Sequence, residues 1–127
     1  MTTFTETRHA AEFILSEASG HRSRDNATLV SGNNLQAGTV LALDSTSTPD
    51  TLVYTKYDGA RDSGALPDPY PTAILINDVD ATSANVACAV LARDAEVNLR
   101  LLTYPNQSEE EADVVRLLKL VGIVCRS

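Results

Sequence analysis

Four acidic side chains are spaced in a way that suggests acid–base chemistry or a metal site. Asp94 and Glu96 stand two residues apart in R-D-A-E-V, and Asp78 and Asp80 repeat this spacing in N-D-V-D. On an extended strand, residues two apart lie on the same face. Hydrolases use paired carboxylates as acid and base, and Mg²⁺ takes carboxylates as ligands. No phosphate-binding glycine loop accompanies either pair, so the alternative of a small trimeric β-fold nucleotide hydrolase rests on the carboxylates alone.

The remaining reactive side chains favour structural roles. His21 has no second His or Cys at a ligand or triad spacing, which indicates a solvated loop histidine. Cys88 and Cys125 each lie in an apolar strand-like run, which is typical of small buried thiols rather than of a disulfide framework. We therefore expect no catalytic residue, no metal site and no cofactor.

A short charged segment follows Gly20 in the order H-R-S-R-D-N. We interpret Arg22, Arg24 and Asp25 as a local ion-pair cluster of small individual strength, and as a candidate subunit seam.

Length and charge exclude several function classes. The chain has 127 residues, enough for one domain and one modest core. Its formal net charge is −7, from 17 acidic against 10 basic residues, so its field repels phosphate backbones and argues against direct nucleic-acid binding. No apolar run is long enough to cross a membrane, and the N-terminus has no apolar signal core. We expect no membrane contact, and a protein that stays in the cytosol or leaves it by a non-secretory route.

Two apolar runs, Ala73 to Ile76 and Val86 to Ala92, organise the rest of the chain. The polar cluster between them is rich in Asn, Asp and Ser, which favour turns, so the runs predict two paired buried strands. The second run is almost continuously apolar, and we expect it to be the central strand with both faces covered. Aromatic residues make up only 5% of the chain, so the core is light and neighbouring copies are expected to complete the burial.

The other elements follow from turn and cap signals. We expect strands at 13–15, 27–30, 39–43, 51–57 and 123–125, a tight hairpin joining 27–30 to 39–43, and a helical turn over 93–97. Ala60 to Pro71 is expected to be an irregular, proline-rich crossover. Besides the nucleotide hydrolase, a further alternative function is a binding module that receives a peptide or glycan at this crossover. A capping box at Ser108 and Glu111 predicts a helix that ends at Gly122. The fold class is mainly β, with one C-terminal amphipathic α-helix.

The N-terminus differs in composition from everything after it. Residues 1–12 are polar and threonine-rich with a lone aromatic, Phe4, so they cannot form a core, and we expect an arm ordered only by a partner. Residues 13–127 then form a single β-rich domain. Thr2, Thr3, Thr5 and Thr7 suit strand addition, in which backbone hydrogen bonds supply the affinity.

Four segments occur in an order that resembles a known family. They are F-I-L-S-E-A-S-G-H-R-S-R-D, S-G-N-N-L-Q-A-G-T-V-L, V-L-A-R-D-A-E-V-N and a helix that closes on G-I-V-C-R. Together they span about Ala10 to Arg126 and resemble the tailed-phage head decoration proteins, the lambda protein D family. Compared with the lambda protein, this chain is longer, particularly from Asp44 to Tyr70.

The resemblance implies a β-clip-like fold assembled as a homotrimer. The trimer would sit at three-fold positions on the outer surface of the expanded phage capsid, after assembly in the host cytoplasm, and would stabilise the head against the pressure of packaged DNA. It also implies that the arm adds as a strand to the major capsid protein, and it carries no catalytic residue or cofactor. The capsid-binding arm then comprises Thr2, Thr3, Phe4, Thr5, Glu6, Thr7, Arg8 and Phe13.

Overall fold

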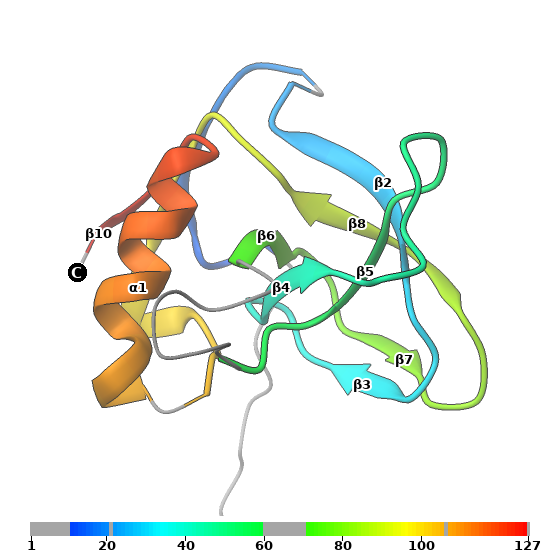
Figure 1. The fold of residues 1–127 in the computed structure, drawn as a ribbon. Helices are drawn as coiled ribbons and strands as arrows, with labels where there is room; N and C mark the ends of the chain where they lie inside the picture. Colours follow the sequence, from blue (N-terminus) through cyan, green and yellow to red (C-terminus); the bar gives the residue numbers. More distant parts are fainter. Residues whose placement is uncertain (1–10, 21, 60–70, 106, 127) are drawn as a thin grey trace, which may run out of the picture.

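The strands form three sheets in the computed structural model, which describes residues 11–20, 22–59, 71–105 and 107–126 (Figure 1). A closed barrel has the strand order β2 (Arg24–Leu29), β5 (Val53–Lys56), β4 (Val40–Leu43), β6 (Pro71–Leu75) and β8 (Val86–Leu91). A three-stranded sheet has the order β1 (Ile14–Glu17), β9 (Ala95–Asn98) and β10 (Ile123–Arg126), and β3 (Asn33–Leu35) pairs with β7 (Val79–Ala81). The fold is thus mainly β, as predicted.

Helical structure lies near the C-terminus, as predicted. A 3-10 helix, η1 (Leu99–Leu101), precedes α1 (Gln107–Leu120), which packs on β10 and β6. The helix begins one residue before Ser108, a difference within the usual uncertainty of helix ends. The side chains of residues 107–110 lie outside the description, so the capping box stays a prediction. Gly122 has φ +89° and follows the helix, which confirms the predicted left-handed cap.

Two hydrophobic cores share the strands β4, β6 and β8. The barrel core has buried residues from all five barrel strands and fills their interior: Ala27, Leu29, Leu41, Tyr54, Ala73, Leu75, Ala81 and Val90. The outer core lies between the barrel, the three-stranded sheet and α1: Phe13, Val40, Ala42, Tyr57, Ile74, Ile76, Leu91, Ala95, Val97, Leu99, Leu102, Tyr104, Val114, Leu118 and Ile123. Because side chains alternate along a strand, each shared strand serves both cores.

The strand covered on both faces is β6, not β8. Residues 73–76 are at most 2% exposed and alternate between the two cores. In β8 only Val90 and Leu91 are buried, whereas Ala87 is exposed. The pairing of the two apolar runs is confirmed, with Ile74 opposite Leu91. The prediction that β8 is covered on both faces was wrong, since it pairs with β6 over its last two residues only and reaches past it beside β2.

Two local predictions were also wrong. Segments 27–30 and 39–43 do not form a hairpin, because β2 lies between β5 and β8 while β4 lies between β5 and β6. The chain between Gly32 and Gly38, both at positive φ, leaves the barrel to form β3. Residues 93–97 do not form a helical turn, because β9 begins at Ala95 and pairs with β1 and β10 on either side. The final strand is confirmed as β10.

Candidate functional site

Most of the predicted arm lies outside the described residues, namely Thr2, Thr3, Phe4, Thr5, Glu6, Thr7 and Arg8. Phe13 is described, and its side chain is 1% exposed in the outer core. Its carbonyl accepts a hydrogen bond from the Asn98 backbone N–H at 2.8 Å. Phe13 therefore belongs to the core of the domain.

The chain enters the domain through a turn at Ala11. The Ala11 N–H donates to the Ile76 carbonyl at 3.0 Å, and the Ile14 N–H donates to the Ala11 carbonyl at 3.0 Å. Ala11 has φ +60°, a left-handed conformation that costs a non-glycine residue about 1–2 kcal/mol. The surrounding hydrogen bonds hold this conformation, so the direction in which the chain enters is set by contacts within the domain.

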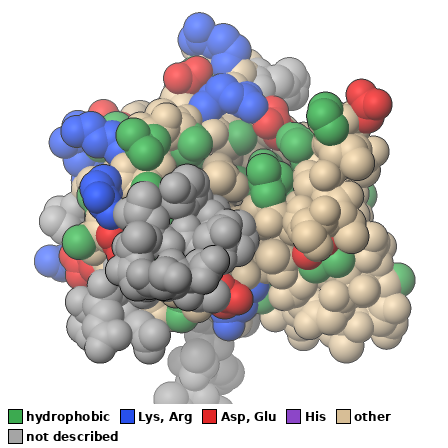
Figure 2. All heavy atoms as spheres, viewed as in Figure 1, with side chains coloured by type: hydrophobic (Ala, Val, Ile, Leu, Met, Phe, Trp, Pro, Cys, Tyr) green, Lys and Arg blue, Asp and Glu red, His purple; other side chains and the backbone are tan. Residues whose placement is uncertain are grey.

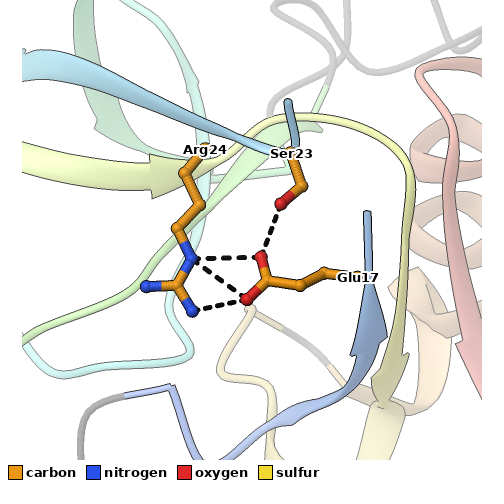
Figure 3. A network of polar contacts seen from close by, with 3 residues as sticks. All are labelled: Glu17, Ser23 and Arg24. Carbon is orange, nitrogen blue, oxygen red and sulfur yellow. Dashed lines mark hydrogen bonds and ion pairs between the residues drawn. The ribbon is translucent and has the colours of Figure 1, made fainter. Parts of the chain in front are cut away.

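A polar network joins the end of β1 to the start of β2 (Figure 3). The fully buried Ser23 hydroxyl donates to Glu17 Oε2 at 2.5 Å. Arg24 donates from Nη2 to Oε1 at 2.6 Å and from Nε to Oε2 at 3.0 Å, so it binds both oxygens of the carboxylate. These bonds, with the one from Arg24 foremost, hold the pKa of Glu17 below its ordinary value. Glu17 is therefore ionised, and its hydrogen bonds connect the three-stranded sheet to the barrel.

A second ion pair lies beside the first. Arg93, in the bend between β8 and β9, donates from Nη2 to Asp25 Oδ2 at 2.5 Å and from Nη1 to the Arg22 carbonyl at 2.7 Å. The Ala92 N–H donates to the Ser23 carbonyl at 2.8 Å. The four segments that meet here are the end of β1, the start of β2, the end of β8 and the bend before β9, and we call this region the corner.

The predicted seam residues all lie at the corner, but they do not pair with one another. Arg24 pairs with Glu17 and Asp25 pairs with Arg93, while the side chain of Arg22 is exposed and its carbonyl accepts from Arg93. The interpretation as a local ion-pair cluster was wrong because successive side chains on β2 point to opposite faces. Glu17 and Arg93 were missed, since no local spacing links them to partners 7 and 68 positions away.

Acid is expected to weaken the hydrogen bonds that Glu17 makes with Ser23 and Arg24. A carboxylate whose folded-state pKa is lowered stabilises the fold above its ordinary pKa of about 4.5, and this stabilisation is lost as the pH falls through the lower folded-state value. Because the pair is partly exposed, we expect a loss of about 1 kcal/mol or less. Thermal unfolding at pH 7 and at pH values below 4.5 should show a smaller pH effect in Glu17→Gln than in the wild type. Glu12→Gln, at an exposed position, is the control, and an equal pH effect in all three proteins would contradict the expectation.

The first pair of candidate catalytic carboxylates, Asp78 and Asp80, accepts hydrogen bonds from different segments of the chain. Asp78 Oδ1 accepts from the Ala37 N–H at 2.8 Å, and Asp80 Oδ1 accepts from the Thr82 N–H at 3.1 Å and lies 2.5 Å from its hydroxyl. Asp80 therefore closes a local turn, whereas Asp78 joins its loop to a segment 41 positions away in the sequence.

The second carboxylate pair is divided by the bend. Asp94 has φ +54° and precedes β9, whereas Glu96 lies within β9 and faces Arg126 at 3.5 Å. The two do not share one strand face as the hydrolase alternative required. Within the described parts of the chain, no three His, Cys, Asp or Glu side chains gather as a metal site. His21 and the crossover residues 60–70 lie outside the description.

Both cysteines are free, as predicted, and half-buried rather than fully buried. Burial raises the pKa of the Cys88 thiol, and it raises that of Cys125 to about 11. Both thiols are therefore protonated at neutral pH, which makes them poor nucleophiles.

Comparison with known proteins identifies the family. Residues 3–123 match the family model described as bacteriophage lambda head decoration protein D, which covers nearly the whole chain. The comparison with curated proteins gives no match. In the described residues, no helix has the length and apolar character needed to cross a membrane. The family match confirms the resemblance found in the four segments, and the chain belongs to the bacteriophage lambda head decoration protein D family.

Proposed function

We propose that this protein is a cement protein that binds as a homotrimer at three-fold positions of the expanded phage head. The observation that carries the proposal is the family match over residues 3–123. In this role the N-terminal arm adds as a strand to the major capsid protein, and each trimer joins neighbouring capsid subunits. The head is then stabilised against the internal pressure of the packaged DNA.

The anchored entry at Ala11 supports this division of labour between arm and domain. The domain holds Ala11 and Phe13 by backbone hydrogen bonds, so the residues before them are attached to a fixed point. A threonine-rich arm has the residue type that favours extended structure. One arm of this length binds weakly, but three arms on one trimer act at high effective concentration, which raises the overall affinity by orders of magnitude.

The distribution of charge supports a place outside the DNA. From residue 26 to 92, the described acidic residues are Asp44, Asp50, Asp58, Asp78 and Asp80, against one described basic residue, Lys56. In Figure 2 most Lys and Arg side chains lie toward the top and left, with a further one at the bottom centre, and none appears on the right-hand side of this face. A surface of this kind repels phosphate backbones. It suits a protein whose partner is the shell rather than the DNA.

Removing the arm tests the proposal. Deletion of residues 2–9 leaves Ala11 and Phe13 in place, so we expect a folded trimer with an almost unchanged unfolding temperature. The same protein should no longer bind expanded shells of its phage. Co-sedimentation and imaging of expanded and unexpanded shells, mixed with wild-type and truncated protein, measure the binding.

A protein in which residues 2–9 are replaced by a Gly–Ser segment of equal length is the matched control. It keeps the length of the arm but loses its side chains and its preference for extended structure. We expect it to bind shells far more weakly than the wild type. Normal decoration by the truncated protein would refute the role of the arm, and images of decorated shells without three copies around each three-fold position would refute the trimer.

A further inference from the structure

The segment Ala11–Glu17, between the arm and the barrel, is attached to the domain at its first end by core contacts. The Ala11 N–H bonds the Ile76 carbonyl, and the Phe13 carbonyl bonds the Asn98 N–H. Ile76 directly follows β6, and Asn98 is the last residue of β9, so strands of two different sheets hold the entry point. The buried Phe13 ring adds a hydrophobic contact that cannot be withdrawn without opening a cavity.

The middle of this segment is held much less firmly. Among the described strands, β1 is an edge strand that pairs with β9 alone. The pairing covers three residue pairs and is interrupted between Ile14 and Ser16, and Leu15 at the interruption is 54% exposed. Such a short, interrupted pairing gives β1 little resistance to being pulled away from β9, because its hydrogen bonds can open one after another.

Glu17, the last residue of β1, is hydrogen-bonded to residues at the start of a different sheet. Figure 3 shows its carboxylate pointing from β1 toward Ser23 and Arg24 at the start of β2. Ser23 is fully buried, and its carbonyl accepts from the Ala92 N–H at 2.8 Å, so the connection continues from Ser23, just before β2, to Ala92, just after β8. The Ala18 N–H also donates to the Asp94 carbonyl at 2.9 Å, just after the strand.

From this arrangement, and resting on the proposed function of the arm, we infer that Ala11–Glu17 is a mechanical anchor. It carries the pull on the shell-bound arm into the barrel, and Glu17 is the positioning residue that keeps β1 in place under load. The bonds from Ser23 Oγ, Arg24 Nε and Arg24 Nη2 end on one carboxylate. They must all break for β1 to leave, so their stabilisation acts mainly on the rate at which β1 detaches.

Pulling the full-length protein by its N-terminus against its C-terminus tests the anchor directly. Once the Ala11 and Phe13 contacts nearer the pulled end have opened, the release of β1 at a fixed load should be up to about fivefold faster in Glu17→Gln than in the wild type, the ratio that corresponds to about 1 kcal/mol. Arg116→Gln is the matched control, since it breaks an exposed ion pair with Asp113 on α1, at 2.8 Å, away from the corner. Equal release rates in Glu17→Gln and the wild type would overturn the inference.

Decorated shells separate this inference from the function on which it rests. We expect Glu17→Gln to occupy unstressed expanded shells like the wild type, and to be lost up to about fivefold faster from DNA-filled heads under osmotic stress. If the deletion of residues 2–9 abolishes decoration but Glu17→Gln is retained under stress, the anchor is refuted and the proposed function stands. If the deletion leaves decoration intact, the proposed role of the arm fails, and the anchor fails with it. Equal acceleration of loss with and without stress would mean that Glu17 serves only the stability of the fold, and would also refute the anchor.

Discussion

The substitution Leu118→Asp is expected to leave the chain unfolded. Leu118 is 0% exposed on α1 and lies in the outer core with Val114 and Ile123. The change removes about 1.5–3 kcal/mol of hydrophobic stabilisation. It also places a carboxylate in an apolar site, at a cost of several kcal/mol. The sum approaches or exceeds the whole stability of a typical domain, about 5–15 kcal/mol. Circular dichroism and thermal unfolding measure the loss.

Leu120 on the same helix provides the control. It is 77% exposed, so Leu120→Asp makes the same chemical change outside the core and should lower stability by about 1 kcal/mol or less, mainly because a carboxylate opposes the dipole at the end of the helix. The comparison isolates burial from helix propensity, because the residue types and the helix are the same. A folded Leu118→Asp protein with a wild-type unfolding temperature would show that α1 is not part of the cooperative core.

Truncation of neighbouring residues on β6 should destabilise both cores by similar amounts. Ile74 belongs to the outer core and Leu75 to the barrel core, and both are 0% exposed. We expect Ile74→Ala and Leu75→Ala each to lower the free energy of unfolding by about 2–5 kcal/mol, because each leaves a cavity. Since one strand serves both cores, each variant should still unfold in a single transition when monitored by denaturant titration.

Leu43→Ala is the matched control for these two variants. Leu43 ends β4 and is 39% exposed, so its truncation should cost much less than either β6 substitution. Separate unfolding transitions in Ile74→Ala or Leu75→Ala would contradict the shared-strand arrangement, because they would mean that one core survives the loss of the other.

Elements with a strong local signal could be predicted from the sequence. The apolar stripe of α1, the left-handed cap at Gly122 and the apolar run that became β6 all express their conformation within a few residues. Turn residues and caps act through nearby backbone groups, so their signals survive without knowledge of the fold. The order of the four family segments is likewise a property of the chain alone, and the match to residues 3–123 confirms the family that it indicated.

Pairing between distant strands could not be predicted in the same way. The apolar run of β8 shows the same composition as a strand covered on both faces, yet its first half lies beyond β6 with Ala87 exposed. Small alanines tolerate either environment, so composition does not distinguish them. The parallel pairing of β2 with β5, which closes the barrel, has no local signal, because the two strands are separated by β3, β4 and their loops.

The sequence by itself determined the family, the mainly β class, the C-terminal helix and the distinct composition of residues 1–12, because composition, periodicity and segment order do not depend on how the chain folds. Only the tertiary structure decided that Phe13 lies in the core and that Glu17, Ser23 and Arg24 form one network between β1 and β2. The physical reason is that a buried ring and a bidentate ion pair depend on which strands become neighbours. That choice is made by the packing of two cores around shared strands rather than by any local pattern.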